Sequence, residues 1–467
     1  MADIAPTIPR LENRTPVDWL SILLARLDAQ ARRVAVPEAY YNGVHPLQFA
    51  TTKFREAFGQ LFGAFADNWC GIVVDAPVER LQVIGFRLAG AESADNDAWG
   101  IWQRNSMDVE SVIAHTEAGK AGTAYILVDP NDGEPRITVE HASQVVVASD
   151  PGDRRSRLAA LKRWQGDDGH LYATVYLPDY VVKFESVEPV QMIGGGQTEY
   201  RIRTDDASGP NPLGIVPVVP LQNTPTLLYG GESDLKPAIP IQNAINKLCS
   251  DLMVASEFGA FRQRVLTGVE IPRDPETGRP LGRSEITAAM SRLWTFESPD
   301  AKVTDLGQTD LSNFTKAVDM FRQDLAAQTR TPPHYLLGQV VNASGDALKV
   351  AEAGLVSKCR RKILYFSDPW EEAMSLALAA TGRTVAPADV QSLWADPERT
   401  SLAELVDASV KKRTLGIPLE VIWLELGYTP AEIEDMKNLA GLPDRPPRTA
   451  TLANVPPVID GGTPTNA

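Results

Sequence analysis

The chain has 467 residues, with 45 Lys and Arg against 60 Asp and Glu, which gives a formal net charge of −15 at pH 7. A chain of this length is too long for one ordinary core, so two to four structural units are expected. The negative charge excludes bulk electrostatic attraction to nucleic acid, because such binding needs Lys and Arg to displace counterions from phosphates. Any contact with DNA is therefore expected to be local or weak.

The sequence predicts no contact with a membrane. No stretch approaches the roughly 20 uninterrupted apolar residues that would span a bilayer. Residues Met1 to Glu12 lack the basic and then apolar pattern of a secretory signal. The protein is therefore expected to remain in the cytoplasm where it is made.

Residues 1–230 change from a helical period to a strand period. Apolar residues recur at helical spacing in two runs, Trp19, Leu20, Leu23, Leu24, Leu27 and Trp69, Val73, Val74, Leu81. Strands are then predicted at 122–129 and 136–140, around the turn Pro130–Gly133, and at 144–148, 171–177 and 181–184. This part is expected to be an α+β unit with an antiparallel sheet.

Two long helices are predicted next, within residues 231–262 and 306–330. In the first, one buried face is indicated by Ile241, Ile245, Leu248 and Leu252. In the second, a near-heptad stripe is formed by Leu311, Phe314, Val318, Phe321 and Leu325. Each helix would be roughly 30 Å long, and the two could lie side by side.

A small insert, residues 263–305, separates these helices. It contains a loop rich in proline and glycine, Ile271–Pro280, with a short helix after Ser284 and a strand-like stretch at Leu293–Phe296. The insert is too small to form a substantial core alone, so a partner or further copies would help to bury it.

An uncharged loop follows the second helix. Thr331, Pro332 and Pro333 must end that helix, because proline lacks the amide donor and excludes helical geometry at the preceding residue. Another helix is predicted from Asn342 or Ser344 to about residue 380, with a kink or break at Pro369. The tip between them consists of Gly338, Gln339, Val340, Val341, Asn342 and Ala343.

The long helix carries the dense basic run Lys358, Arg360, Arg361 and Lys362. Two interpretations remain open: a solvated face that pairs with acidic neighbours, or a contact with DNA or an acidic partner. At the end of the chain, residues 441–467 are rich in proline and poor in large apolar residues, which predicts a disordered tail.

The usual catalytic and cofactor patterns fail on their chemistry, so neither an enzyme nor a cofactor is expected. Gly119-Lys120 lacks the other residues of a phosphate-binding loop, and Ser233 lies in GESDL, where a helix cap at Ser233 or Asp234 is favoured. The segment from Asp129 resembles a calcium loop, but Gly133 stands where an oxygen ligand is needed. The five histidines form no zinc-binding pair, so no metal site is expected.

Ordered blocks along the chain carry a family resemblance. These blocks are Tyr40–Gly43, Asn68–Cys70, Gly214–Pro220, Gly231–Leu235, Gln242–Lys247, Ala255–Phe258 and Ser344–Leu348. The chain resembles the portal proteins of tailed double-stranded-DNA bacteriophages, of the kind found in actinobacterial phages. Each block alone is weak, and the specificity comes from their order.

The resemblance implies a ring of twelve copies at one capsid vertex, through which double-stranded DNA enters during packaging and leaves at infection. The portal fold would assign the wing to residues 1–230, the stem to the two long helices and the clip to 263–305. The uncharged tip would be the tunnel loop that meets DNA without reading its sequence, and residues 381–440 would form a helical crown.

The resemblance also implies partners. The clip would dock the large terminase subunit during packaging and head-to-tail connector or adaptor proteins later, with contacts at Arg273, Glu276 and Arg279. Scaffold and major capsid proteins would meet the wing and inner surface, and the protein would end in the virion. The basic run matches no defined family function, and would line the channel or brace the crown.

Two other interpretations stay open. A minor capsid or adaptor protein would share the absence of catalytic motifs, but would not require paired long helices around a small insert. A hydrolase using scattered carboxylates such as Asp167 and Asp168 is a further alternative, although adjacent residues in a turn usually diverge.

Overall fold

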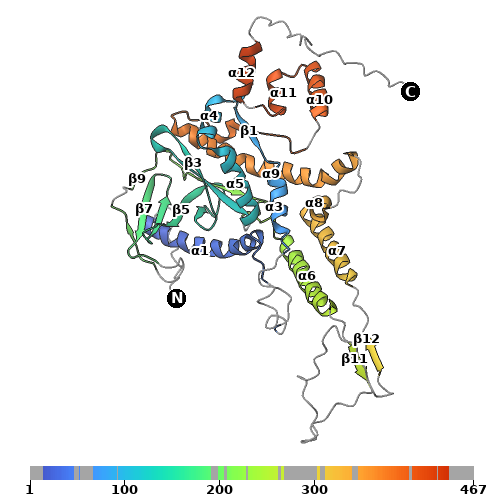
Figure 1. The fold of residues 1–467 in the computed structure, drawn as a ribbon. Helices are drawn as coiled ribbons and strands as arrows, with labels where there is room; N and C mark the ends of the chain where they lie inside the picture. The colour runs from blue at the N-terminus through green and yellow to red at the C-terminus, as the bar shows by residue number, and fades with distance from the viewer. Residues whose placement is uncertain are drawn as a thin grey trace, which may run out of the picture.

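The computed structural model describes residues 14–46, 52, 67–91, 93–190, 198–204, 208–227, 230–260, 264–267, 302–305, 311–338, 345–398, 402–428 and 430–440. A mixed body of helices and strands lies at the centre (Figure 1). Two helices with a two-stranded sheet at their far end project from it in one direction, and three short helices lie at the opposite end. The fold class is therefore α+β, as predicted.

Helix α1, Pro16–Tyr41, begins at a capping box, in which the Thr15 hydroxyl accepts from the Asp18 amide and the Asp18 carboxylate accepts from the Thr15 amide. Its apolar face is the predicted one, and Trp19, Leu23 and Leu27 are buried against one sheet. That sheet has the order β4-β5-β6-β7-β8, with β9 paired to β7, and every pairing in it is antiparallel. The strands are Val145–Ser149, Arg157–Gln165, Leu171–Tyr176, Tyr180–Ser186, Tyr200–Ile202 and Gly209–Pro210.

A second antiparallel sheet has the order β10-β2-β3, formed by Val218–Gln222, Thr123–Asp129 and Arg136–Glu140. The predicted hairpin at Pro130–Gly133 is confirmed, with a single 3-10 turn at Asn131–Gly133. The central strand β2 is buried on both faces, because Ile126 and Val128 enter one core while Tyr125 and Leu127 enter another. Helix α5, Met107–Ala121, covers one side of this sheet.

The predicted helical crown at residues 381–440 needs a correction. Residues Val390–Trp394 form strand β13, which pairs antiparallel with β1, Val83–Leu88, in the body. Val390, Ser392 and Trp394 lie on one side of this strand, as every second residue does, and β1 supplies its backbone hydrogen-bond partners. The α-helical part of this region comes after the strand and consists of α10, Leu402–Thr414, α11, Leu419–Glu425, and α12, Pro430–Ala440.

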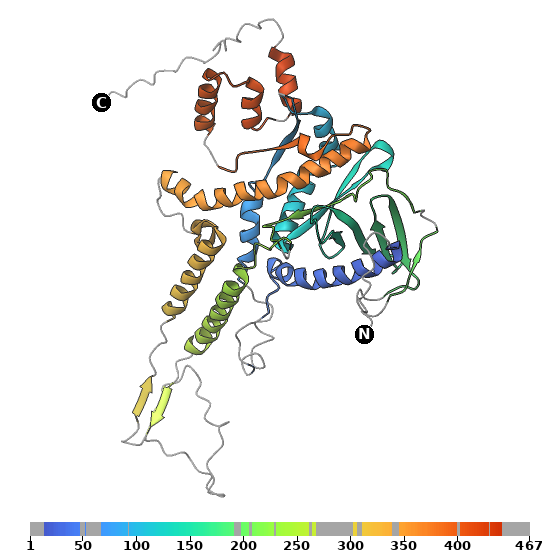
Figure 2. The ribbon, with the colours of Figure 1, turned by 180° about the vertical axis from the view of Figure 1, so that it is seen from behind.

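The two predicted long helices are α6, Ala238–Ala260, and α7, Ser312–Thr329, and they lie side by side in both views (Figures 1 and 2). Where the two helices leave the body, their apolar side chains pack with those of α3, Cys70–Val78, in one core. Among the predicted contact residues, Ile241, Ile245, Val318 and Leu325 are buried, while Leu248, Leu252, Leu311, Phe314 and Phe321 are half-buried. At the far end of the helices, β11, Arg264–Thr267, pairs with β12, Lys302–Asp305.

The rest of the insert, including the stretch at Leu293–Phe296 and the helix after Ser284, lies outside the described residues, as does the predicted tail at 441–467.

Helix α7 ends at Thr329, and Arg330 follows it with a left-handed φ of 56°. The short helix α8, Pro333–Leu337, starts at the second proline, where a missing amide donor costs nothing. Helix α9, Gly345–Ala380, starts one residue after Ser344 and continues through Pro369 without the predicted break. It packs on α3, β2, β10 and β13, so the contacts of both faces hold it together across the proline.

An aromatic cluster joins α9 to the body. Helix α4, Asn96–Arg104, contributes Trp99 and Trp102, and the Trp102 ring meets Trp370 edge to face at 5.2 Å. The imidazole of His115 stacks on Phe366 at 4.9 Å and accepts a hydrogen bond from Trp370 Nε1. Helices α5 and α9 therefore pack against each other through their inner faces.

Candidate functional site

The body, the paired helices and α9 meet at a junction made by two glycines. Gly122 ends α5 with a φ of 89°, and Gly231 lies against it so closely that an added Cβ would stand 1.8 Å from the Gly122 oxygen. The buried Asn223 ties the two segments, since its amide donates to the Gly122 carbonyl and its Nδ2 donates to the Glu232 carbonyl. This contact fixes where the chain leaves the body to begin α6.

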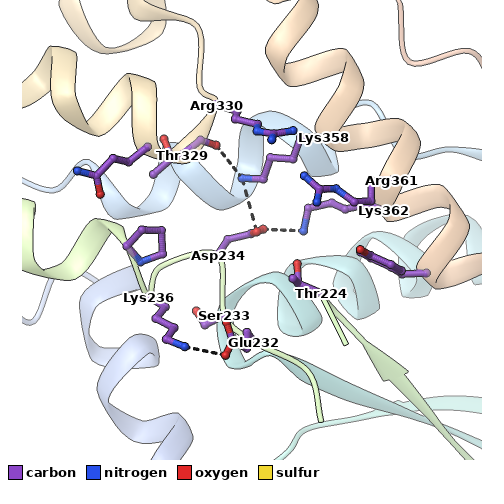
Figure 3. A pocket seen from close by; sticks show the side chains of 13 residues that line it. Thr224, Glu232, Ser233, Asp234, Lys236, Thr329, Arg330, Lys358, Arg361 and Lys362 are labelled. Carbon is purple, nitrogen blue, oxygen red and sulfur yellow. Dashed lines mark hydrogen bonds and ion pairs between the residues drawn. The ribbon is translucent and has the colours of Figure 1, made fainter. Parts of the chain in front are cut away.

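Three buried charges lie at this junction (Figure 3). The ammonium group of Lys362 is 2.6 Å from Asp234 Oδ2, and that of Lys358 is 3.5 Å from Asp234 Oδ1. Lys362 also donates to Asn223 Oδ1, and Lys358 donates weakly to the carbonyl of Thr329 at the end of α7. One carboxylate before α6 therefore holds two successive turns of α9.

The charge states follow from burial and pairing. Burial alone would favour the neutral carboxyl, but the ammonium groups of Lys362 and Lys358 lower the pKa of Asp234 below its usual value. Burial lowers the pKa of Lys358, and the Asp234 carboxylate opposes that change. The cluster is therefore held by attraction between ionised groups that have left water.

A cleft of about 230 Å³ opens beside this cluster. Its charged lining consists of the cations Lys236, Arg330, Lys358, Arg361, Lys362 and the anions Glu232 and Asp234. Lys236 pairs with Glu232 at 2.6 Å. Arg330 and Arg361 are exposed and make no ion pair with the described part of the chain. The cleft therefore has an excess of positive charge in a negatively charged protein.

The basic run on α9 is thus divided by the structure. Lys358 and Lys362 pair with an acidic neighbour, as one interpretation expected, but Lys362 is buried and Lys358 is largely buried at the wall of the cleft. Arg360 is exposed and pairs with Glu398 at 3.1 Å. Arg361 is exposed on the next position, and a contact of this run with DNA, a channel or a crown stays a prediction.

A second anchor lies beside the predicted loop, and sequence reasoning missed it. The buried guanidinium of Arg80 donates to Tyr335 Oη in α8 at 3.0 Å and pairs with Glu352 in α9 at 3.2 Å. These two helices flank the segment at 339–344, so one arginine from the end of α3 ties both of its ends. No spacing pattern around Arg80 could have indicated partners so far away in sequence.

The predicted residues at the tip of the loop and in the insert lie outside the described part of the chain. This holds for Gln339, Val340, Val341, Asn342 and Ala343 of the loop and for Arg273, Glu276 and Arg279 of the insert. Gly338 is described, and its φ of 63° ends α8 in a conformation that glycine adopts freely. The roles of these residues stay predictions.

No catalytic arrangement was found among the side chains that the structure places. No group of three or more His, Cys, Asp or Glu in the described ranges could hold a metal ion. The Ser233 hydroxyl accepts from the Leu235 amide, and Asp234, expected as an alternative cap, is instead the acceptor of the buried ion pairs. Asp168 is engaged by Tyr172 and by the amide of His170.

In the described ranges of the chain, every helix is either too short or too polar to cross a bilayer.

The comparisons with known proteins identify the family to which this mixed body with paired projecting helices belongs. The family described as "Phage portal protein, SPP1 Gp6-like" matches residues 21–438. A portal protein of Mycobacterium phage D29 is 32% identical over 389 residues, which cover 78% of this chain and 77% of that protein. A portal protein of Mycobacterium phage L5 is 31% identical over 389 residues, covering 78% and 76%. The chain belongs to the phage portal protein family.

Solved structures are similar at low identity. A chain of the "Virion of native gene transfer agent (GTA) particle" has a TM-score of 0.43 and 12% identity, covering 80% of this chain and 89% of that chain. A chain of the "Neck of native GTA particle computed with C12 symmetry" has a TM-score of 0.41 and 11% identity, covering 83% and 94%.

The family has direct consequences for the earlier interpretations. Portal proteins are structural components of the phage particle, which agrees with the predicted place in the virion. The match over most of the chain favours a portal protein over a minor capsid or adaptor protein, and over a hydrolase.

Proposed function

We propose that twelve copies of this chain form a ring at one capsid vertex, the conduit through which double-stranded DNA is packaged and ejected and the head-to-tail connector of the particle. Residues 1–230 would form most of the wing, α6 and α7 the stem, and 263–305 the clip. The segment at 338–343 would be the tunnel loop, and α10 to α12 the crown. Assembly would take place in the host cytoplasm.

The observation that carries this proposal is the pair α6 and α7, which project from the body with β11 and β12 at their far end (Figure 1). Below the contact with α3, the helices have few described partners, and Phe314 and Leu252 stay half-exposed. Apolar side chains on an isolated two-helix projection would gain from neighbouring copies, as a ring provides.

The helices that flank the proposed tunnel loop support a role at the DNA. Its two ends are held by α8 and α9, which Arg80 ties together through Tyr335 and Glu352. A loop with fixed ends and an uncharged tip would meet DNA through shape and close packing. Weak binding suits a conduit, because tight phosphate contacts would hold a moving genome in place.

The partners would follow from the same arrangement. The clip, with Arg273, Glu276 and Arg279, would dock the large terminase subunit during packaging and adaptor proteins of the neck afterwards. Scaffold and major capsid proteins would contact the wing. DNA would pass without sequence-specific contacts.

The loop's role is tested with a double substitution, Val340→Asp and Val341→Asp, in the full chain. Two negative charges per copy on the proposed tunnel loop would repel DNA phosphates, so packaged DNA per particle should fall at least tenfold while rings still assemble. The measurement is the DNA content of purified heads, with ring assembly followed by negative-stain imaging.

The matched control is Val340→Thr with Val341→Thr, which keeps the side-chain shape and adds no charge. Control heads should fill normally. Heads of the Asp variant that also fill normally would show that the tip does not meet the DNA.

A further inference from the structure

The outer face of α5 is an apolar stripe without a partner in the described structure. Val109, Val112 and Ile113 are 63%, 46% and 43% exposed, whereas Ala114 and Ala118 on the other side of the helix are fully buried. Val112 and Ile113 follow Val109 by three and four residues, so the three side chains share one side of the helix. Aliphatic side chains gathered in this way indicate a contact with another protein surface.

An acidic cleft of about 550 Å³ lies directly beside this stripe, and Val112 forms part of its wall. Its lining includes the carboxylates of Asp75, Glu79 and Asp108 and, among the residues that the structure describes, no basic side chain. We call the stripe and these three carboxylates the acidic face. A partner for this face needs apolar side chains next to positive charge.

Such a surface exists elsewhere on the same chain, on the outer side of α9. Val350 and Leu364 expose 77% and 72% of their side chains. At 100° per residue they lie within about 60° of each other and of the exposed Arg361. Arg361 and the exposed Arg330 border the cleft with excess positive charge. We call Val350, Leu364, Arg361 and Arg330 the basic face.

The basic face points away from α5. Val350 and Leu364 lie about 160° from Phe366 around α9, at 100° per residue. The Phe366 ring stacks on His115 of α5 with planes 4° apart, so the two faces lie on different sides of the molecule. In Figure 2, which turns the molecule by 180°, α9 lies toward the viewer, on the side opposite to that of Figure 1.

We propose that the acidic face of each copy docks on the basic face of the next copy, so that the ring closes head to tail through α5 and α9. This inference rests on the proposed ring and names its contact. A single contact between two different faces leaves one acidic face and one basic face uncovered in a dimer. Only closure by rotation covers every face.

The charges favour a second copy of this chain, docked head to tail, over a symmetric dimer or DNA. Two acidic faces or two basic faces placed together would repel, which disfavours a symmetric dimer. DNA could pair with Arg361 and Arg330, but Val350 and Leu364 would gain nothing from phosphates, and DNA could not bind the acidic face. A second copy of the chain would cover the apolar side chains of both faces and pair their opposite charges in one contact.

The first test is a cross-link between two kinds of chain. Chains with Val112→Cys and chains with Leu364→Cys, both carrying Cys249→Ser and different tags, are co-expressed and treated with a flexible bis-maleimide. The remaining Cys70 and Cys359 are buried. Cross-links are expected between the two kinds of chain and not within either kind expressed alone. Cross-links within one kind, or none in assembled rings, would overturn the proposal.

The second test disrupts each face separately with Val112→Asp or Leu364→Asp. Each should lower the yield of rings at least tenfold at the concentration where the unsubstituted chain is half assembled, while circular dichroism of the monomer stays unchanged. The matched control is Leu415→Asp, because Leu415 is 81% exposed and lies outside both faces.

The outcomes separate this inference from the proposed function. Normal rings from both Asp variants would overturn the docking contact and leave the portal function standing. Rings of an Arg361→Glu variant that assemble normally but retain less DNA would assign the basic face to DNA, and also overturn it. An unsubstituted chain that remains monomeric would overturn both.

Discussion

Asp234 is the residue on which the junction depends most, because it lies between the buried ammonium groups of Lys358 and Lys362. An Asp234→Asn substitution would leave two buried cations facing each other without a counter-charge. We expect a loss of roughly 3–5 kcal/mol in the free energy of unfolding, the usual effect of removing one partner from a buried ion pair. Urea denaturation of the monomeric chain at pH 7 measures it.

The control for the Asp234→Asn substitution is a substitution at the nearby Lys236, whose ion pair with Glu232 is largely exposed. Lys236→Ala should change the free energy of unfolding by no more than about 0.5 kcal/mol. Adding Lys362→Met to Asp234→Asn should recover part of the loss. A loss below about 1 kcal/mol for Asp234→Asn alone would contradict the role of this carboxylate.

His115 makes stability depend on pH. Burial, helped by the nearby Lys362 charge, lowers the pKa of His115 to about 3, whereas an unfolded histidine has a pKa of about 6.5. Between these values the unfolded chain binds a proton that the folded chain does not, so the free energy of unfolding falls as pH falls. Between pH 7 and pH 5 this group alone should remove about 2 kcal/mol.

The measurement compares the unsubstituted chain with His115→Gln at both pH values. The variant should lose about 2 kcal/mol less on acidification, although it is less stable at pH 7. Trp370→Phe removes the hydrogen bond to His115 but keeps the buried imidazole, so it should retain the pH dependence. Equal pH dependence of all three proteins would show that His115 does not stay neutral in the fold.

Residues such as Asp234 also mark the limit of what the sequence could predict. The motif around Ser233 indicated a helix cap, and the Ser233 hydroxyl does accept from the Leu235 amide. The partners of Asp234 come from α9, more than 120 residues further along the chain. Local spacing carries no information about such a contact, and the same is true of Arg80 with Tyr335 and Glu352.

At the scale of elements, prediction succeeded where one face is buried and the period is regular. The stripe from Trp19 to Leu27 predicted α1, and the alternation around Pro130–Gly133 predicted the β2–β3 hairpin. Strand β5 was missed because Lys162 and Arg163 interrupt its apolar pattern, and the structure pairs them with Glu140 and Asp28. Ion pairs made across the fold thus allowed charged residues in a central strand.

The other element errors have tertiary causes as well. Strand β13 follows the long helix and was included in a helical crown, because its pairing with β1 joins residues far apart in sequence. Of the kink or break predicted at Pro369, the break did not occur, because contacts on both sides of the proline outweigh the lost hydrogen bond in the continuous helix α9. Each error concerns a local preference that packing overrides.

At the scale of the whole molecule, the projecting helices and the two faces on α5 and α9 are the parts that neighbouring copies in the proposed ring would cover. The order of short blocks along the chain indicated the portal family, and the match over residues 21–438 confirms it. The faces themselves could not be predicted from the sequence. Their exposure follows only from how His115 and Phe366 bring α5 and α9 together.

The proposed closed ring around a channel can be tested directly on the purified full-length protein. The measurement is its native mass, combined with negative-stain imaging of its symmetry. We expect a ring of twelve copies with a central opening. A chain that stays monomeric at assembly concentrations, with or without scaffold protein, would contradict it.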